Sequence, residues 1–148
     1  MNTELGSLQW HSFRNDANTA ASAHGIIRLT GINTSNGLTF LTAAQPDANT
    51  TAYAVNGPVE IAAGSYGRCV LLGPCVFAYD TGTPAFNDFY SAKSGQWTAN
   101  KTGSFIRCLG IINSTNKFAL GVIGGAGGDS IIGKLDADLT YRNASGVA

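Results

Sequence analysis

The glycine-rich segment near the carboxyl end resembles a nucleotide-binding loop in its spacing. Residues 128–134 read Gly-Asp-Ser-Ile-Ile-Gly-Lys, which matches the phosphate-binding pattern as far as its lysine. The next residue of that pattern is Ser or Thr, because its hydroxyl holds the magnesium ion, and this chain has Leu135 there. No predicted strand supplies a second metal-binding aspartate. The segment is therefore not expected to bind a nucleotide.

The histidines and carboxylates do not form a recognisable catalytic set. His11 and His24 are thirteen residues apart, and no Gly-x-Ser-x-Gly turn accompanies them. Glu60 alternates with apolar residues, which directs it to solvent or to a strand partner. Asp80 and Asp88 fall in predicted loops, where aspartate usually caps turns; a glycosidase would need such a pair about 5–10 Å apart across a cleft. The sequence predicts a protein that is not an enzyme and has no cofactor or metal.

Three cysteines, Cys69, Cys75 and Cys108, show neither a disulfide framework nor the spacing of a zinc site. The simplest expectation is that they are small, buried apolar residues. One alternative stays open, because a turn at Gly73-Pro74 would bring Cys69 and Cys75 close enough to pair.

The composition of the 148 residues indicates a protein that associates with other proteins. Charged residues make up 12% of the chain, about half the usual share, and the formal net charge is zero. The basic residues are scattered, which argues against nucleic acid as a partner. No apolar run approaches the ~20 residues that span a bilayer, so no membrane partner is expected, nor is a cleaved secretion signal. A weakly charged surface repels other proteins little.

Short apolar segments separated by turn residues predict an all-β domain. Turn signals recur about every 8–12 residues, which is typical of a small β-barrel or β-sandwich. The dipeptide Asn36-Gly37 predicts a hairpin, and Gly110 inside an apolar strand predicts a bulge. The stretch 68–123 is expected to hold the centre of the core. The expected strands are residues 25–30, 38–42, 53–55, 59–62, 68–72, 76–79, 89–92, 96–99, 105–112 and 118–123.

Two extended arms are expected to flank this domain. Residues 1–20 form the predicted N-terminal arm, residues 21–123 the β domain, and residues 124–148 a Gly-rich linker and C-terminal tail. The N-terminal arm either folds back on its own domain or docks on a neighbouring subunit, because its apolar residues need a cover. The residues predicted to contact other proteins are Leu5, Leu8, Trp10, Phe13, Ile131, Ile132, Leu135, Leu139 and Tyr141.

Aromatic residues in the predicted loops suggest an alternative function, the binding of sugars. Aromatic side chains grouped on one face would make a platform for sugars, although filling the core is their commoner role. The residues concerned are Tyr66, Tyr79, Phe86, Phe89, Tyr90 and Trp97.

The order of strands and loops resembles a known family. Residues 58–67 (Pro-Val-Glu-Ile-Ala-Ala-Gly-Ser-Tyr-Gly) precede 78–85 (Ala-Tyr-Asp-Thr-Gly-Thr-Pro-Ala), and 94–97 (Ser-Gly-Gln-Trp) precede 105–112 (Phe-Ile-Arg-Cys-Leu-Gly-Ile-Ile). This order resembles the capsid cement (decoration) proteins of tailed bacteriophages, over about residues 20–123. The resemblance implies a compact β-barrel-like fold and no catalytic residues. It also implies homotrimers on the capsid outer surface, assembled in the host cytoplasm, that brace the major capsid protein.

Three hypotheses follow in order of preference. The first is a virion structural protein that cements and stabilises the major capsid lattice. The second is a phage fibre or baseplate module that binds host glycans through its loop aromatics. The third is an enzyme such as a small glycan hydrolase.

Overall fold

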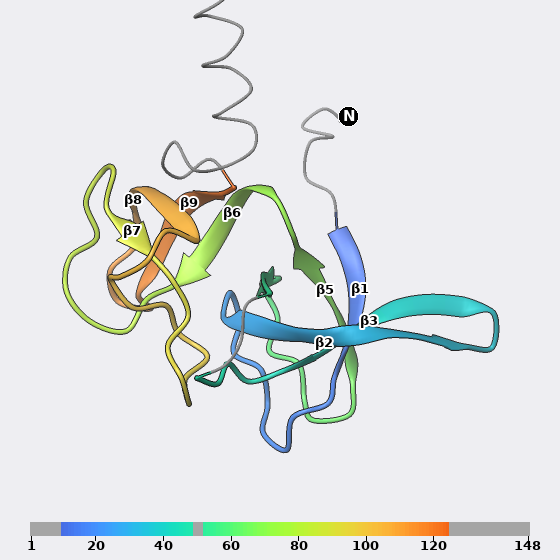
Figure 1. Cartoon of the computed structure of the whole chain (residues 1–148). Coiled ribbons are helices and arrows are strands. Elements are labelled where there is room, and N and C mark those ends of the chain that lie inside the picture. Colours follow the sequence, from blue (N-terminus) through green and yellow to red (C-terminus); the bar gives the residue numbers. More distant parts are fainter. Residues whose placement is uncertain (1–9, 49–51, 125–148) are drawn as a thin grey trace, which may run out of the picture.

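The protein folds into two curled β-sheets (Figure 1). The structure, a computed structural model, describes residues 10–48 and 52–124. Every regular element in these two ranges is a strand, which confirms the predicted all-β class. Within the same ranges there is no helix long and apolar enough to span a membrane.

Five strands close into a barrel in the order β1-β3-β2-β4-β5. They are β1 (Trp10–Asn15), β2 (Ile26–Ser35), β3 (Leu38–Ala44), β4 (Tyr53–Asn56) and β5 (Tyr66–Val70). The first strand closes the barrel, because it lies parallel to β3 on one side and antiparallel to β5 on the other. Closure removes the open edges that a weakly charged sheet would otherwise expose to other chains.

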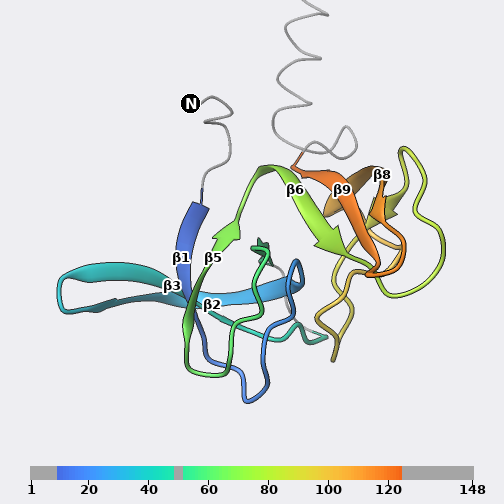
Figure 2. The same cartoon turned by 180° about the vertical axis from the view of Figure 1, so that it is seen from behind.

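Four further strands form the second sheet, in the order β6-β9-β8-β7. They are β6 (Gly73–Ala78), β7 (Phe89–Tyr90), β8 (Ile106–Asn113) and β9 (Phe118–Ile123). The register of β8 against β9 shifts between Cys108 and Gly110, which confirms the predicted bulge. Figure 2 shows that β5 bends into β6, so one continuous stretch of chain joins the two sheets.

The hydrophobic interior consists of two clusters. One lies within the barrel and includes Phe13 and Trp97. The other lies between the barrel and the second sheet and includes Phe77 and Tyr90. The prediction that residues 68–123 hold the centre of the core is therefore too narrow, since the barrel cluster draws most of its members from earlier in the chain.

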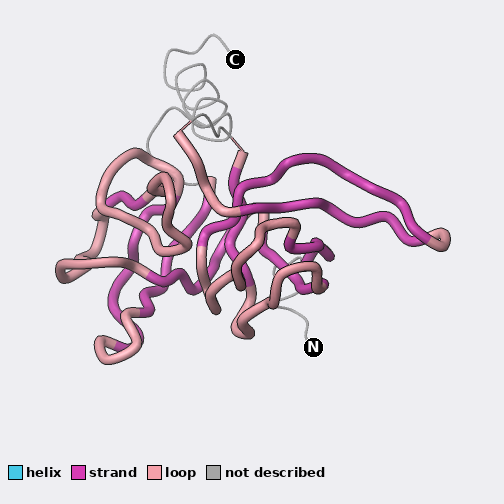
Figure 3. Tube along the Cα trace, turned by 90° about the horizontal axis from the view of Figure 1, so that it is seen from below, coloured by secondary structure: helices cyan, strands magenta, loops and turns pink. Residues whose placement is uncertain are grey.

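The hairpin formed by β2 and β3 turns at Asn36-Gly37, as predicted. Both residues have positive φ, 52° and 81°, as expected for the tight turn that this dipeptide favours. Beyond the barrel the two strands continue as a projecting ribbon, which Figure 3 shows extending away from the body. All residues from 30 to 39 are exposed. We call residues 30–39 the hairpin tip.

Two predicted strands, 59–62 and 96–99, are instead irregular segments with single bridges. Ile61 pairs with Ala21, and Ala99 pairs with Tyr79. These segments satisfy their backbone groups through isolated contacts: the carbonyl of Trp97, for example, accepts a hydrogen bond of 2.6 Å from the amide of Ile26.

Candidate protein-interaction surfaces

The described part of the predicted N-terminal arm belongs to the domain. Phe13, predicted to contact another protein, is fully buried in the barrel cluster. Trp10 is 37% exposed, and its ring lies 4.9 Å from the guanidinium carbon of Arg68 on the neighbouring strand. The prediction for Phe13 is therefore wrong, because pairing of β1 with both β3 and β5 turns this side chain inward. Of these two predicted contact residues, Trp10 alone remains available to a partner.

The other predicted contact residues lie outside the described ranges. They are Leu5, Leu8, Ile131, Ile132, Leu135, Leu139 and Tyr141.

Two buried asparagines hold the segment 59–62 and the residues that follow β1 beside the barrel. The amide nitrogen of Asn15 donates to the carbonyls of Thr19 (2.9 Å) and Ile61 (3.0 Å), and its oxygen accepts from the amide of Ala17 (3.0 Å). The amide nitrogen of Asn56 donates to two more carbonyls, at 2.9 and 3.0 Å. These bonds add to the single backbone bridge between Ile61 and Ala21.

An apolar groove of about 290 Å³ lies where the barrel meets the second sheet. None of its lining side chains is an acid, a lysine or an arginine, and burial lowers the pKa of the single histidine, which favours the neutral imidazole. The oxygen Oδ1 of Asn56, a lining residue, has no hydrogen-bond partner among the described residues. The residues that define this apolar groove are Trp10, His24, Val55, Asn56, Pro58, Val70, Pro74, Cys75, Val76 and Leu120.

The groove combines an inner floor with an outer sheet face. Val55 and Val70 are buried core residues from the barrel. Val76 and Leu120 are directly paired on β6 and β9, on the face opposite the buried Phe77. Sequence reasoning missed this surface because its walls come from both sheets and only their packing brings them together.

The hairpin tip is a second exposed apolar feature. Its two largest apolar side chains, Ile32 and Leu38, are 69% and 71% exposed. The register pairs Ile32 with Leu41 and Ser35 with Leu38, and neighbouring residues of a strand point to opposite faces, so Ile32 and Leu38 lie on opposite faces of the ribbon. The tip contains no charged residue.

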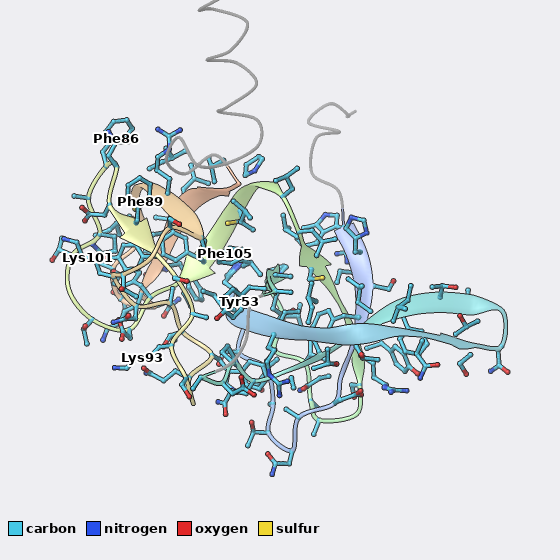
Figure 4. All side chains as sticks on the ribbon, viewed as in Figure 1. Tyr53, Phe86, Phe89, Lys93, Lys101 and Phe105 are labelled. Carbon is cyan, nitrogen blue, oxygen red and sulfur yellow. The ribbon has the colours of Figure 1, made fainter. Side chains whose placement is uncertain are left out.

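The six candidate sugar-binding aromatics do not gather on one face. Tyr79, Tyr90 and Trp97 are buried, in line with the commoner core role. Phe86 is exposed at the outer end of the loop before β7, and Figure 4 shows it lying apart from the neighbouring pair Tyr53 and Phe105. Of the three that keep exposed surface, Phe86 and Phe89 belong to the second sheet and the loop before it, whereas Tyr66 lies on β5 of the barrel, so the three come from two separate places.

The two loop carboxylates cap turns. Asp80 accepts a hydrogen bond from the amide of Thr81 (2.6 Å), and Asp88 accepts one from the amide of Ala85 (2.9 Å) and pairs with Lys101 at 3.4 Å. In the described ranges, His, Cys, Asp and Glu side chains form no group of three that would hold a metal ion.

All three cysteines are buried and free, so the simple expectation is confirmed and a Cys69–Cys75 disulfide is not formed. Loss of hydration on burial raises the pKa of both Cys69 and Cys75 to about 12, and raises that of Cys108 as well. Since the thiolate is the reactive form, the folded protein is expected to react negligibly with a thiol reagent near neutral pH. In guanidinium chloride all three thiols should titrate. Rapid labelling of the folded chain would contradict this burial.

Comparison with known proteins identifies the fold. The sequence matches no protein-family model and no curated protein. Among solved structures, the chain is similar to the N base of head fiber gp8.5 of bacteriophage phi29, with a TM-score of 0.53 and 12% sequence identity. The match covers 78% of this chain and 94% of that chain. At this level of identity the likeness concerns the fold.

Proposed function

We propose that this chain is a virion structural protein of a tailed bacteriophage that binds the outer surface of the capsid. The observation that carries the proposal is the shared fold: nearly the whole of a head fiber N base superimposes on most of this chain. A domain with a similar fold could attach to a phage head in a similar way. The proposal therefore rests on analogy of fold, and the surface features described above support it.

The surface chemistry supports binding in place of catalysis. Two exposed apolar features, the apolar groove and the hairpin tip, carry no charge, which suits protein partners. The carboxylates that catalysis would use are engaged in turns. We therefore propose a non-enzymatic protein, assembled in the host cytoplasm, whose partners are the major capsid protein and further copies of itself in a homotrimer.

Within this proposal we favour the cement role, in which the bound protein braces the capsid lattice. A second role, as the base of a head fiber, is supported by the likeness in fold to the phi29 head fiber N base. Glycan binding through loop aromatics is the least supported role, because the candidate aromatics are divided between the core and separate places on the surface.

The test uses phage heads that lack this protein, mixed with the purified full-length chain. We expect the chain to sediment with the heads and to raise the temperature at which they release their DNA. Heads that already carry the protein serve as the control, since their sites are filled. Binding without stabilisation would favour the fiber-base role over cement. Failure to bind heads at all would overturn the proposed function.

A further inference from the structure

Among the described residues, no third strand covers the hairpin tip, although four of its residues border a hollow of about 440 Å³ with Ser12, Phe40 and Tyr66. Residues 30–39 are all exposed, and β4 covers the flank of β2 only from Ile26 to Arg28. A two-stranded ribbon alone in water is marginally stable, so a ribbon this long gains order from packing on something else. Leu38, close to the turn, presents most of its side chain to solvent.

The apolar groove has the complementary properties. A cavity of about 150 Å³ lined by apolar groups is enough to hold a benzene-sized molecule, so a groove of about 290 Å³ can hold a leucine side chain together with adjacent backbone. Its floor, formed in part by Val55 and Val70, belongs to the core cluster between the sheets. A leucine placed there would extend that core.

The chemistry of the groove favours an uncharged, apolar occupant. A charged group would be buried without an ionic partner, which is costly, because the lining contains no acid, lysine or arginine. The hairpin tip has no charged residue, so it meets this requirement.

The hairpin tip does not reach the groove of its own chain. Its strands are paired from Arg28 and Ala44 out to Ser35 and Leu38, which directs the ribbon away from the second sheet (Figures 1 and 2). The groove lies at the junction with that sheet, on β1, β4, β5, β6 and β9. A hairpin tip that fills this groove must therefore come from another molecule.

We propose that the hairpin tip of one copy inserts Leu38 into the apolar groove of the next copy. A protrusion and a hollow at different places on one surface make a head-to-tail contact, which forms a ring when the rotation between copies closes. Three such contacts close a trimer. This inference rests on the homotrimer of the proposed function and assigns the surfaces that build it.

Charge placed on either surface tests the contact through the oligomeric state of the full-length chain. Leu38→Asp and Leu120→Asp should each weaken association at least ~100-fold, because each buries an unpaired carboxylate. Ile32→Asp is the matched control: its position is equally exposed but lies on the opposite face of the ribbon, and this variant should remain trimeric. Sedimentation velocity at matched concentrations gives the comparison, with circular dichroism to confirm folding.

Directed cross-linking tests the contact itself. Chains carrying Leu38→Cys, mixed with chains carrying Leu120→Cys and oxidised, should form covalent dimers of one chain of each kind. Replacing the first partner by Ile32→Cys should abolish them. The native thiols give little background, since all three are buried.

Several results would overturn the proposal. They are a monomeric wild-type chain, a trimer that persists in Leu38→Asp, or cross-links that form equally well from position 32. Loss of the trimer in Leu120→Asp alone would mean that a different segment fills the groove. Binding of each variant to phage heads is measured separately, so a wrong interface and a wrong function give different outcomes.

Discussion

Phe13→Ala is expected to lower the free energy of unfolding by about 3–5 kcal/mol, the usual cost of removing a fully buried phenylalanine. The side chain of Phe13 is 0% exposed and packs within the barrel. Its ring also lies close to Gly67 on β5, where a methyl group added to the glycine would stand 3.1 Å from the ring and 2.6 Å from Ile61. The cavity left by alanine has little freedom to collapse, because two neighbouring strands hold β1 in place.

Urea unfolding of the two proteins measures this difference. His11→Ala provides the control, because His11 lies two residues before Phe13 on the same strand and is exposed. This substitution should change the free energy of unfolding by no more than about 0.5 kcal/mol. A loss below about 1 kcal/mol for Phe13→Ala would mean that residues 10–15 form a detachable arm and not a strand of the barrel.

Asn15→Ala is the second substitution with a large expected effect, a decrease of about 2–3 kcal/mol in the free energy of unfolding. The change leaves the carbonyl of Thr19 and the amide of Ala17 without their present partner, and it removes one of the two hydrogen bonds that the carbonyl of Ile61 accepts. Each buried polar group left unpaired costs about 1–3 kcal/mol. The carbonyl of Ile61 is the least affected, since it keeps the hydrogen bond of 2.8 Å from the amide of Ala21.

Thermal unfolding followed by circular dichroism checks this prediction. Asn33→Ala is a suitable comparison, because Asn33 is exposed on the hairpin tip and its side chain bonds the adjacent amide of Thr34. Equal melting temperatures for the two variants would show that the hydrogen bonds of Asn15 do not hold the segment 59–62 in place.

Local features of the fold were predictable because neighbouring residues determine them. Asn36-Gly37 favours the positive φ angles that the tight turn needs, and Gly110 marks the point where the register of β8 shifts. The strand β1 was harder to recognise, since its partners Leu41–Ala43 and Tyr66–Val70 lie far along the chain. When those partners are not known, the sequence of residues 10–15 indicates a polar arm that contains two isolated apolar side chains.

The prediction of a strand at residues 59–62 was wrong for a related reason. The alternation around Ile61 is typical of a strand, yet side-chain amides supply much of the hydrogen bonding there. Asn15 and Asn56 are polar residues that a sequence pattern assigns to the surface or to turns, and both are buried. Their role depends on carbonyl groups that tertiary packing brings within reach.

The candidate interaction surfaces were predictable only in part. Trp10 was expected to contact a partner, and it lines the apolar groove. The opposing wall residues, Val76 and Leu120, were expected in core strands, because alternation in a largely apolar run does not reveal which face is covered. For the same reason, the sequence predicts only that Leu38 begins a strand, and does not indicate that it is exposed.

The location of the chain in the virion tests the proposed function most directly. Purified particles are separated into heads and tails, and the chain is quantified in each fraction by mass spectrometry against the major capsid protein. Attachment to the capsid predicts that the chain accompanies the heads, in many copies for each particle. A chain confined to the tail fraction in a few copies would contradict the proposal.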